Sequence, residues 1–175
     1  DFGPSETVKG VGVHPHKGFE TVTIAYKGSV AHHDSAGNSG VIKPGDVQWM
    51  TAGAGILHKE YHEERFSKTG GPFEMVQLWV NLPKKDKSAK PHYQAITAMQ
   101  MGKVQLPGNQ GLVNVIAGNF NRIVGPAATY SPVNLFDIKL NKDGSLTTSI
   151  PASHNTALLV INGSIVVNGE KAPEH

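Results

Sequence analysis

The chain has 175 residues, a formal charge of +2 and no cysteine. That length allows one large domain or two small ones with a sizeable core. The small charge gives no electrostatic argument for binding to nucleic acid or to an anionic membrane, and no apolar run is long enough for a transmembrane helix. The lack of cysteine excludes disulfides and thiolate metal sites and favours a cytoplasmic location.

Short β-strands are predicted along most of the chain. Its 20 glycines and 11 prolines are spread throughout, as expected of many strands separated by turns. Only Pro91–Met101 has a brief helical pattern. Strands are expected in 19–34 with a turn at Lys27-Gly28, in 41–50 with a Pro-Gly-Asp turn, in 73–82, in 111–118, in 134–140, and in 156–170 as a hairpin turning at Asn162-Gly163. The sequence therefore predicts an all-β protein with the strand spacing of a barrel or jelly roll.

A crude internal repeat suggests two barrels of one type. Residues 20–40 and 155–172 share the order strand, small-residue turn, Ser, strand and polar turn. We expect an N-terminal metal-binding barrel in 1–90 and a partial C-terminal barrel without a metal site in 91–175, joined by the polar segment 83–94. The second barrel is expected to be incomplete, either because the natural chain continues past His175 or because a second copy covers the open edge. Truncation is the favoured explanation.

Two short motifs place histidines and a carboxylate two residues apart. His14 and His16 form one pair, and His58 and Glu60 form the other. Residues two apart in a strand share a face and lie roughly 7 Å apart. Neighbouring strands would bring these four nitrogen and oxygen ligands together and leave a coordination position open for chemistry. This ligand set suits one divalent ion of iron, zinc, manganese, nickel or copper.

Glu20 competes with Glu60 for the fourth ligand position. It has the parity of the two first histidines, but on a straight strand it would lie roughly 13 Å beyond His16. Only a bend at Lys17-Gly18 would bring it back, so Glu60 is favoured. Otherwise Glu20 is expected to pair with a cation or to accept a hydrogen bond from a ligand histidine. Of the remaining histidines, His32 and His33 are expected to be solvated, and His62 to lie beyond the barrel rim.

The segment from His14 to Glu60, with "GDVQWMTAGAGILH" at its end, closely resembles the N-terminal barrel of the pirin family in the cupin superfamily. "VQLWVNLPKK" continues the resemblance, which is dense from Phe2 to Gln94 and looser from there to His175. It implies double-stranded β-helix (cupin) barrels in a bicupin arrangement. It also implies one metal, Fe(II), held by His14, His16, His58 and Glu60; the wider cupin pattern would instead use Glu20.

The resemblance implies two classes of function. Several pirins are associated with quercetin 2,3-dioxygenase activity, in which O₂ opens the ring of a flavonol and carbon monoxide leaves. Here Glu60 would be both ligand and catalytic proton acceptor, and the expected substrate pocket is lined by Trp49, Met50, Gln77 and Trp79. The alternative is a metal-binding regulatory protein without turnover, such as a transcriptional cofactor or a modulator of a metabolic enzyme. A bicupin that binds metal adventitiously is a third class.

Overall fold

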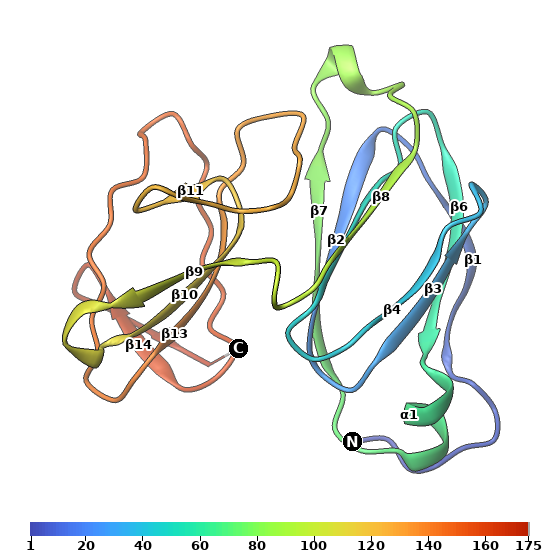
Figure 1. The fold of residues 1–175 in the computed structure, drawn as a ribbon, viewed down its shortest axis with the longest axis horizontal. Coiled ribbons are helices and arrows are strands. Elements are labelled where there is room, and N and C mark those ends of the chain that lie inside the picture. The colour runs from blue at the N-terminus through green and yellow to red at the C-terminus, as the bar shows by residue number, and fades with distance from the viewer. Residues whose placement is uncertain (175) are drawn as a thin grey trace. The chain divides into compact units, whose positions relative to one another are not determined.

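The computed structural model describes residues 1–174, and most of its regular structure is β-strand (Figure 1). The chain divides into two compact units, one from Asp1 to Gly144 and one from Ser145 onward. The predicted all-β class is confirmed. No helix within residues 1–174 is both long enough and apolar enough to span a bilayer.

One sheet of the first unit carries the histidine motifs. Its strands lie in the order β1-β6-β3-β4. Buried and exposed residues alternate along β6 from Ile56 to Glu60, because successive side chains of a strand point to opposite faces. The bounds are Gly10–His16 for β1, Val30–Asp34 for β3, Ser39–Ile42 for β4 and Ile56–His62 for β6. This alternation gives the sheet one interior face.

A second sheet lies against that face, as Figure 1 shows. Its strands lie in the order β7-β2-β5-β8. The bounds are Phe19–Lys27 for β2, Val47–Thr51 for β5, Glu74–Asn81 for β7 and His92–Ile96 for β8, with a short 3₁₀ turn η1 at Lys84–Asp86 before β8. The two four-stranded sheets face each other without closing into one hydrogen-bonded ring.

Tight glycine corners join the two sheets. Gly18, between β1 and β2, has a φ of 76°, and Gly53, between β5 and β6, has a φ of 49°. The Gly18 N–H donates to the Gly53 carbonyl over 2.8 Å, so the two corners lie side by side. A Cβ atom at Gly53 would collide with the backbone of Ala89. Only glycine satisfies both the left-handed conformation and this close approach.

The segment expected to be briefly helical contains strand β8 instead. His92–Ile96 pairs antiparallel with β5, with Thr51 opposite His92. That helical prediction is wrong because pairing with the edge of an existing sheet outweighs a weak local helix preference. The division of the chain into two barrels at residue 90 stays a prediction.

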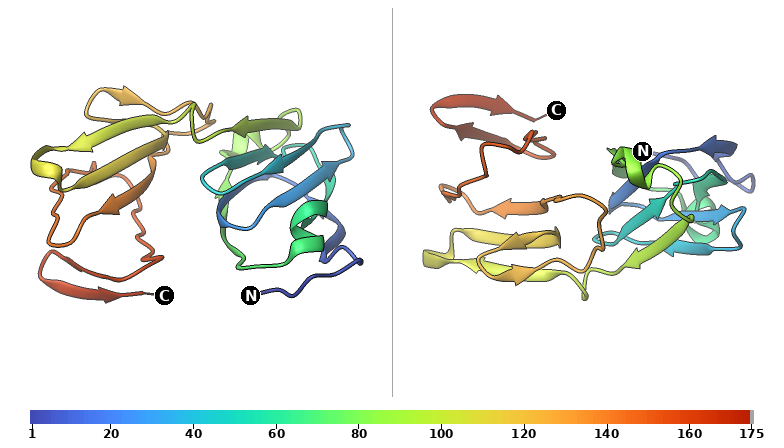
Figure 2. Two further views of the ribbon diagram at one scale, coloured as in Figure 1. Left: turned by 60° about the horizontal axis from the view of Figure 1, so that its bottom comes forward. Right: turned by 90° about the horizontal axis from the view of Figure 1, so that it is seen from above.

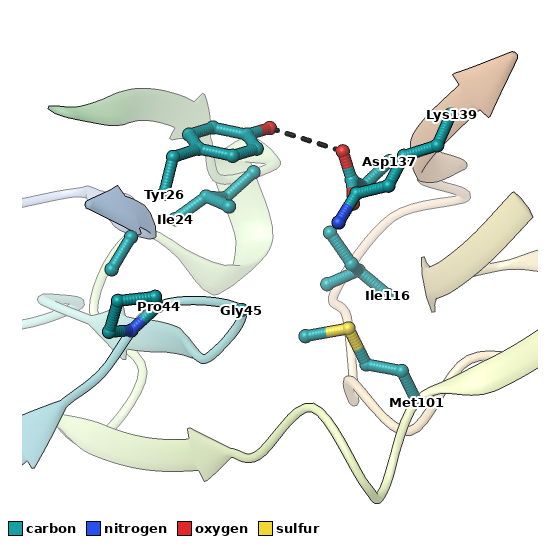
Figure 3. A pocket seen from close by; sticks show the side chains of 9 residues that line it. Ile24, Tyr26, Pro44, Gly45, Met101, Ile116, Asp137 and Lys139 are labelled. Carbon is teal, nitrogen blue, oxygen red and sulfur yellow. Dashed lines mark hydrogen bonds and ion pairs between the residues drawn. The ribbon is translucent and has the colours of Figure 1, made fainter. Parts of the chain in front are cut away.

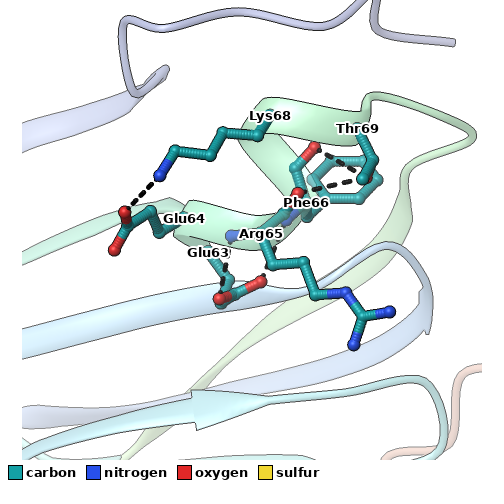
Figure 4. Close-up of polar contacts among 6 residues, drawn as sticks. All are labelled: Glu63, Glu64, Arg65, Phe66, Lys68 and Thr69. Atoms are coloured by element: carbon teal, nitrogen blue, oxygen red, sulfur yellow. Dashed lines mark hydrogen bonds and ion pairs between the residues drawn. The ribbon is translucent and has the colours of Figure 1, made fainter.

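A short helix follows β6. Helix α1 spans Glu64–Thr69, and the Glu63 carboxylate caps it by accepting from the N–H groups of Arg65 and Phe66 (Figure 4). Such a cap contributes about 1 kcal/mol. The N-terminal segment runs beside the helix (Figure 2, left), where the Ser5 N–H donates to the carbonyl of Ser67 over 2.8 Å.

The outer face of the second sheet packs on a further sheet of the same unit. Its strands are β9 Gly102–Leu106, β10 Gly111–Ala117 and β13 Leu135–Leu140, with the turn η2 Pro107–Asn109 after β9 and the short pair β11 Asn119–Phe120 and β12 Ile123–Val124 after β10. Val22, Ile24, Val47 and Trp49 are buried here against Ile116. This is the largest apolar cluster that the structure describes, and it lies away from the histidines.

A cavity of ≈ 180 Å³ lies beside this packed face, lined by Ile24, Tyr26, Met101, Asp137 and Lys139 among others (Figure 3). The Tyr26 O–H donates to Asp137 over 3.4 Å, and the Asn114 side chain donates to the other carboxylate oxygen over 3.0 Å. Burial, and then the Asp137 charge, raise the pKa of Tyr26 well above its usual range. The phenol therefore stays protonated and remains a donor that ties β2 to β13.

Within residues 145–174 of the second unit, β14 Ser164–Val167 pairs with β15 Glu170–Pro173 as a hairpin. Its turn is Asn168-Gly169, with φ angles of 50° and 90°. The predicted turn at Asn162-Gly163 is wrong, because a two-residue hairpin turn of this type needs positive φ at both positions and only Gly163 has it. The polar segment that follows the Asn168-Gly169 turn forms β15.

Candidate metal centre

Three histidine side chains meet on the interior face of the first sheet. His14 and His16 come from β1, and His58 comes from β6 directly opposite His14. One ring nitrogen from each lies within 4.8 Å of the others. The ring centroids of His14 and His58 are 4.3 Å apart, and those of His16 and His58 are 4.7 Å apart. The structure thus brings together three of the four predicted ligands.

A bulge in β1 sets this alignment. The register places Val11 opposite Glu60 but His14 opposite His58, so β1 uses three steps where β6 uses two. An extra residue of this kind re-aims the side chains that follow it. Because of the bulge, the pair His14 and His16 faces the same interior as the pair His58 and Glu60. The spacing of these residues along the sequence does not reveal this arrangement.

The arrangement of the ring nitrogens in these imidazoles points to a cation. Nδ1 of His14 lies 2.8 Å from the Gly12 carbonyl, which only accepts, so Nε2 of His14 presents a lone pair. That Nε2 lies 2.8 Å from Nε2 of His58. Nε2 of His16 and Nδ1 of His58 are buried without a hydrogen-bond partner. Buried polar atoms are rarely left so, and an ion that accepts lone pairs from all three rings fits this set.

The protonation of the cluster favours cation binding at neutral pH. Burial, and after it the neighbouring rings of His14, His16 and His32, lower the pKa of His58 to about 3. Burial and then His14 also lower the pKa of His16. Both rings are therefore neutral, and a metal would displace no proton from them.

Glu60 occupies a polar layer between the two sheets. It lies two residues beyond His58 on the same buried face of β6. Its Oε2 accepts from Gln77 Nε2 over 2.8 Å, and its Oε1 accepts from Thr23 Oγ1 over 3.3 Å and from Gln48 Nε2 over 3.4 Å. Its oxygens are outside the three-histidine group, so its role as the fourth ligand stays a prediction. Metal-binding carboxylates are commonly held by such donors.

Sequence reasoning missed Thr23 and Gln48 as members of this layer. Both are fully buried polar residues, opposite each other on β2 and β5. Their strand parity, shared with Gln77, was the signal that could have found them.

Glu20, the alternative ligand, lies on the other face of β2. It is 1% exposed and accepts from Thr51 Oγ1 over 2.6 Å. Thr23, which faces Glu60, has the opposite parity. The chain does turn at Gly18, but the turn leads into a new strand that directs Glu20 away from the histidines.

The structure separates the four residues expected to line the pocket. Met50, Gln77 and Trp79 share the face of the second sheet that carries Thr23. Trp49 has the opposite parity and packs in the apolar cluster on the outer face. The structure therefore does not bring Trp49 to the histidines.

An exposed aromatic surface adjoins the histidines. The Trp79 side chain is 67% exposed, and its ring centroid lies 5.7 Å from that of His16 and 4.8 Å from that of Phe19. Phe19 lies 5.0 Å from His16. Aromatic rings at such distances offer stacking and edge contacts to a planar ligand.

Two other histidines differ from expectation. His32 is fully buried and stacks on Tyr93, with ring centroids 4.5 Å apart and both nitrogens unpartnered, so the solvated assignment is wrong. His62 is 7% exposed and packs near Phe2, Phe66 and Phe73, so it does not lie beyond the rim. The opposite sheet covers the first, and the N-terminal segment and α1 cover the second. His33 is exposed as expected.

The chain is similar in sequence and in fold to known proteins. Residues 1–80 match the family model described as Pirin. A Pseudomonas aeruginosa protein named "putative quercetin 2,3-dioxygenase" is 52% identical over 170 residues, covering 97% of this chain and 59% of its own length. Pirin-1 of Arabidopsis thaliana is 36% identical over 156 residues, covering 89% of this chain and 52% of its own length.

The crystal structure of quercetin 2,3-dioxygenase from Acinetobacter baumannii superimposes with a TM-score of 0.94 and 49% identity, over 99% of this chain and 60% of that chain. The chain thus spans between 52% and 60% of the length of these three relatives. It carries a pirin-family domain in residues 1–80 and is related to proteins of that family along most of its length.

Proposed function

We propose that the chain holds one divalent metal ion, Fe(II), on His14, His16, His58 and Glu60, and acts in opening the ring of a flavonol such as quercetin with O₂. The observation that carries this proposal is the meeting of three imidazole rings, with one nitrogen of each within 4.8 Å of the others, beside an exposed aromatic surface. A relative named "putative quercetin 2,3-dioxygenase" at 52% identity and the crystal structure of quercetin 2,3-dioxygenase from Acinetobacter baumannii at 49% identity support it. A cytoplasmic location is part of the same proposal.

The donor set fits the proposed ion. Imidazole and carboxylate ligands without sulfur suit iron, zinc, manganese, nickel or copper, and the family resemblance selects iron. When bound, the ion supplies Lewis acidity toward the 3-hydroxyl oxygen of the flavonol and a site that brings O₂ beside it. One flavonol and one O₂ then give one ring-opened ester and one carbon monoxide.

The protein side chains supply binding and proton handling. Glu60 would accept the proton of the 3-hydroxyl group, and the donors from Gln77, Thr23 and Gln48 hold its carboxylate in place. Trp79 would stack on the planar rings of the substrate. The buried walls around His58 and Glu60 limit the access of water to the reacting group.

A second candidate is a metal-binding regulatory protein, and the outer face of the histidine-bearing strands favours it. Val13 and Leu57, which have the opposite strand parity to His14 and His58, are 67% and 47% exposed on β1 and β6. These side chains offer apolar surface to a partner protein. A change at the metal would act on the same two strands that carry this surface.

An aerobic assay with quercetin separates the two functions. The iron-loaded protein should consume quercetin and O₂ together and release carbon monoxide, whereas His16→Ala protein of unchanged circular dichroism should not. An iron-loaded, folded sample without turnover on several flavonols would refute the dioxygenase proposal and favour the regulatory one.

A further inference from the structure

Gln77 connects an exposed aromatic residue with the buried carboxylate. Its side-chain nitrogen donates to Glu60 Oε2 over 2.8 Å and to Thr23 Oγ1 over 3.1 Å. Its side-chain oxygen accepts from the indole N–H of Trp79 over 3.3 Å. Both polar ends of one amide are therefore engaged in a continuous path.

The two end groups of this path select one orientation of the amide. An indole nitrogen only donates, and an ionised carboxylate only accepts. If the Gln77 amide were turned over, two donors would face each other at Trp79 and two acceptors would face each other at Glu60. Each end group therefore reinforces the orientation that the other requires.

The backbone places these residues to link the two sheets. Gln77 and Trp79 are two residues apart on one face of β7, beside Thr23 and Thr21 of β2. Glu60 reaches them from β6 of the opposite sheet. Trp79 is 67% exposed and Glu60 is 7% exposed, so the path runs from the surface to the interior.

We propose that Gln77 is a positioning residue, which holds the Glu60 carboxylate in one orientation and is itself held by the Trp79 indole N–H. A planar ligand that stacks on Trp79 is thereby coupled to the orientation of Glu60. This inference rests on the proposed metal site, but it does not require that the protein turn over a flavonol.

Gln48 provides a matched control. It also donates to Glu60, over 3.4 Å, and is 1% exposed. It makes no hydrogen bond to Trp79 in the part of the chain that the structure describes. Removing the Gln48 amide should therefore disturb the Glu60 carboxylate but leave its link to the exposed Trp79 indole in place.

The first test is a set of double-mutant cycles on Co(II) affinity of the whole protein. Gln77→Leu should weaken Co(II) binding by about 10- to 100-fold, the range for losing a partner of a ligand. Trp79→Phe, which keeps a ring but removes the N–H, should weaken it less. In Glu60→Ala protein, neither Gln77→Leu nor Trp79→Phe should weaken Co(II) binding further. In Gln48→Leu protein, Trp79→Phe should weaken Co(II) binding as much as it does in the wild type. Independent, additive effects of Gln77→Leu and Glu60→Ala would overturn the proposal.

The second test needs no metal. The protein has two tryptophans, so ¹H–¹⁵N spectra contain two indole signals, and buried Trp49 is an internal reference. Glu60→Ala should move the Trp79 signal, and should no longer move it in Gln77→Leu protein. An unmoved Trp79 signal would overturn the inference even if Co(II) binds. Wild-type protein that binds no Co(II) would instead refute the proposed site.

Discussion

The Nε2 atoms of His14 and His58 lie 2.8 Å apart across strands β1 and β6. The hydrogen bond from His14 Nδ1 to the Gly12 carbonyl leaves the Nε2 lone pair of His14 facing its neighbour. Two lone pairs cannot share that space, so a proton or a metal ion must lie between them. His16 Nε2, which is buried and unpartnered, makes the metal ion the better match.

The two buried carboxylates should respond differently to the same substitution. Glu60→Gln should lower metal affinity, because it removes a ligand charge from the interior face. Glu20→Gln should leave affinity within about twofold, since Glu20 lies on the opposite face of β2 and bonds to Thr51. Isothermal titration of both variants with Fe(II) or Co(II) checks this. A larger loss from Glu20→Gln would restore Glu20 as the ligand.

Trp79 should contribute to flavonol binding through its ring. An aromatic pair contributes about 0.5–1.5 kcal/mol beyond burial, so Trp79→Ala should raise the flavonol Kd by about 2- to 12-fold. Trp79→Phe keeps the stacking surface and should change that Kd by less than about twofold. Fluorescence titration of saturated metal–protein samples measures both. Equal weakening by the two variants would show that stacking is not the basis of binding.

The metal-free protein should lose stability as the pH falls below about 6.5. Burial, and then Lys9, lower the pKa of His62 from 6.5 in the folded state. Below pH 6.5 the unfolded state therefore binds more protons, and the free energy of unfolding falls by at most about 1.4 kcal/mol per pH unit for one such group. The contribution of His62 to the free energy of unfolding is fully present above pH 6.5. It is lost as the pH falls toward the lowered pKa of His62 in the folded state.

His62→Phe should flatten this pH dependence, since a phenyl ring can keep the packing near Phe2, Phe66 and Phe73 without titrating. Urea denaturation of the metal-free protein over a pH series measures the slope. In His62→Phe protein the slope of the free energy of unfolding against pH should remain above zero, because burial also lowers the pKa of His16 and His58. An unchanged slope would contradict the role of His62.

Local pattern was enough to predict several of the strands and the histidine motifs. The strand in 73–82 and the turns near Gly28 and Pro44 lie where expected. The placement of Trp49 and Met50 could not be predicted, because either face of β5 could be interior until the sheets on both sides are known. The β1 bulge was hidden for a similar reason, since it exists only in the register with β6.

Burial of isolated polar residues was equally beyond local pattern. His32 lies next to a turn in sequence, yet the sheet that carries Tyr93 covers it. The hairpin turn was misplaced because Asn-Gly occurs twice, and only the backbone conformation of Asn168 distinguishes the two sites. The burial of His32 depends on a segment distant in sequence, whereas the position of the hairpin turn depends on which neighbouring residues pair.

The metal content of wild-type and His58→Ala protein tests the proposed centre most directly. We expect one ion for each chain in the wild type, a near-complete loss in His58→Ala, and no loss in the control His33→Ala, whose exposed ring pairs with Tyr61 instead. The largest apolar cluster lies on the far side of the second sheet, so the fold should survive the change. Full metal occupancy in folded His58→Ala protein would contradict the site.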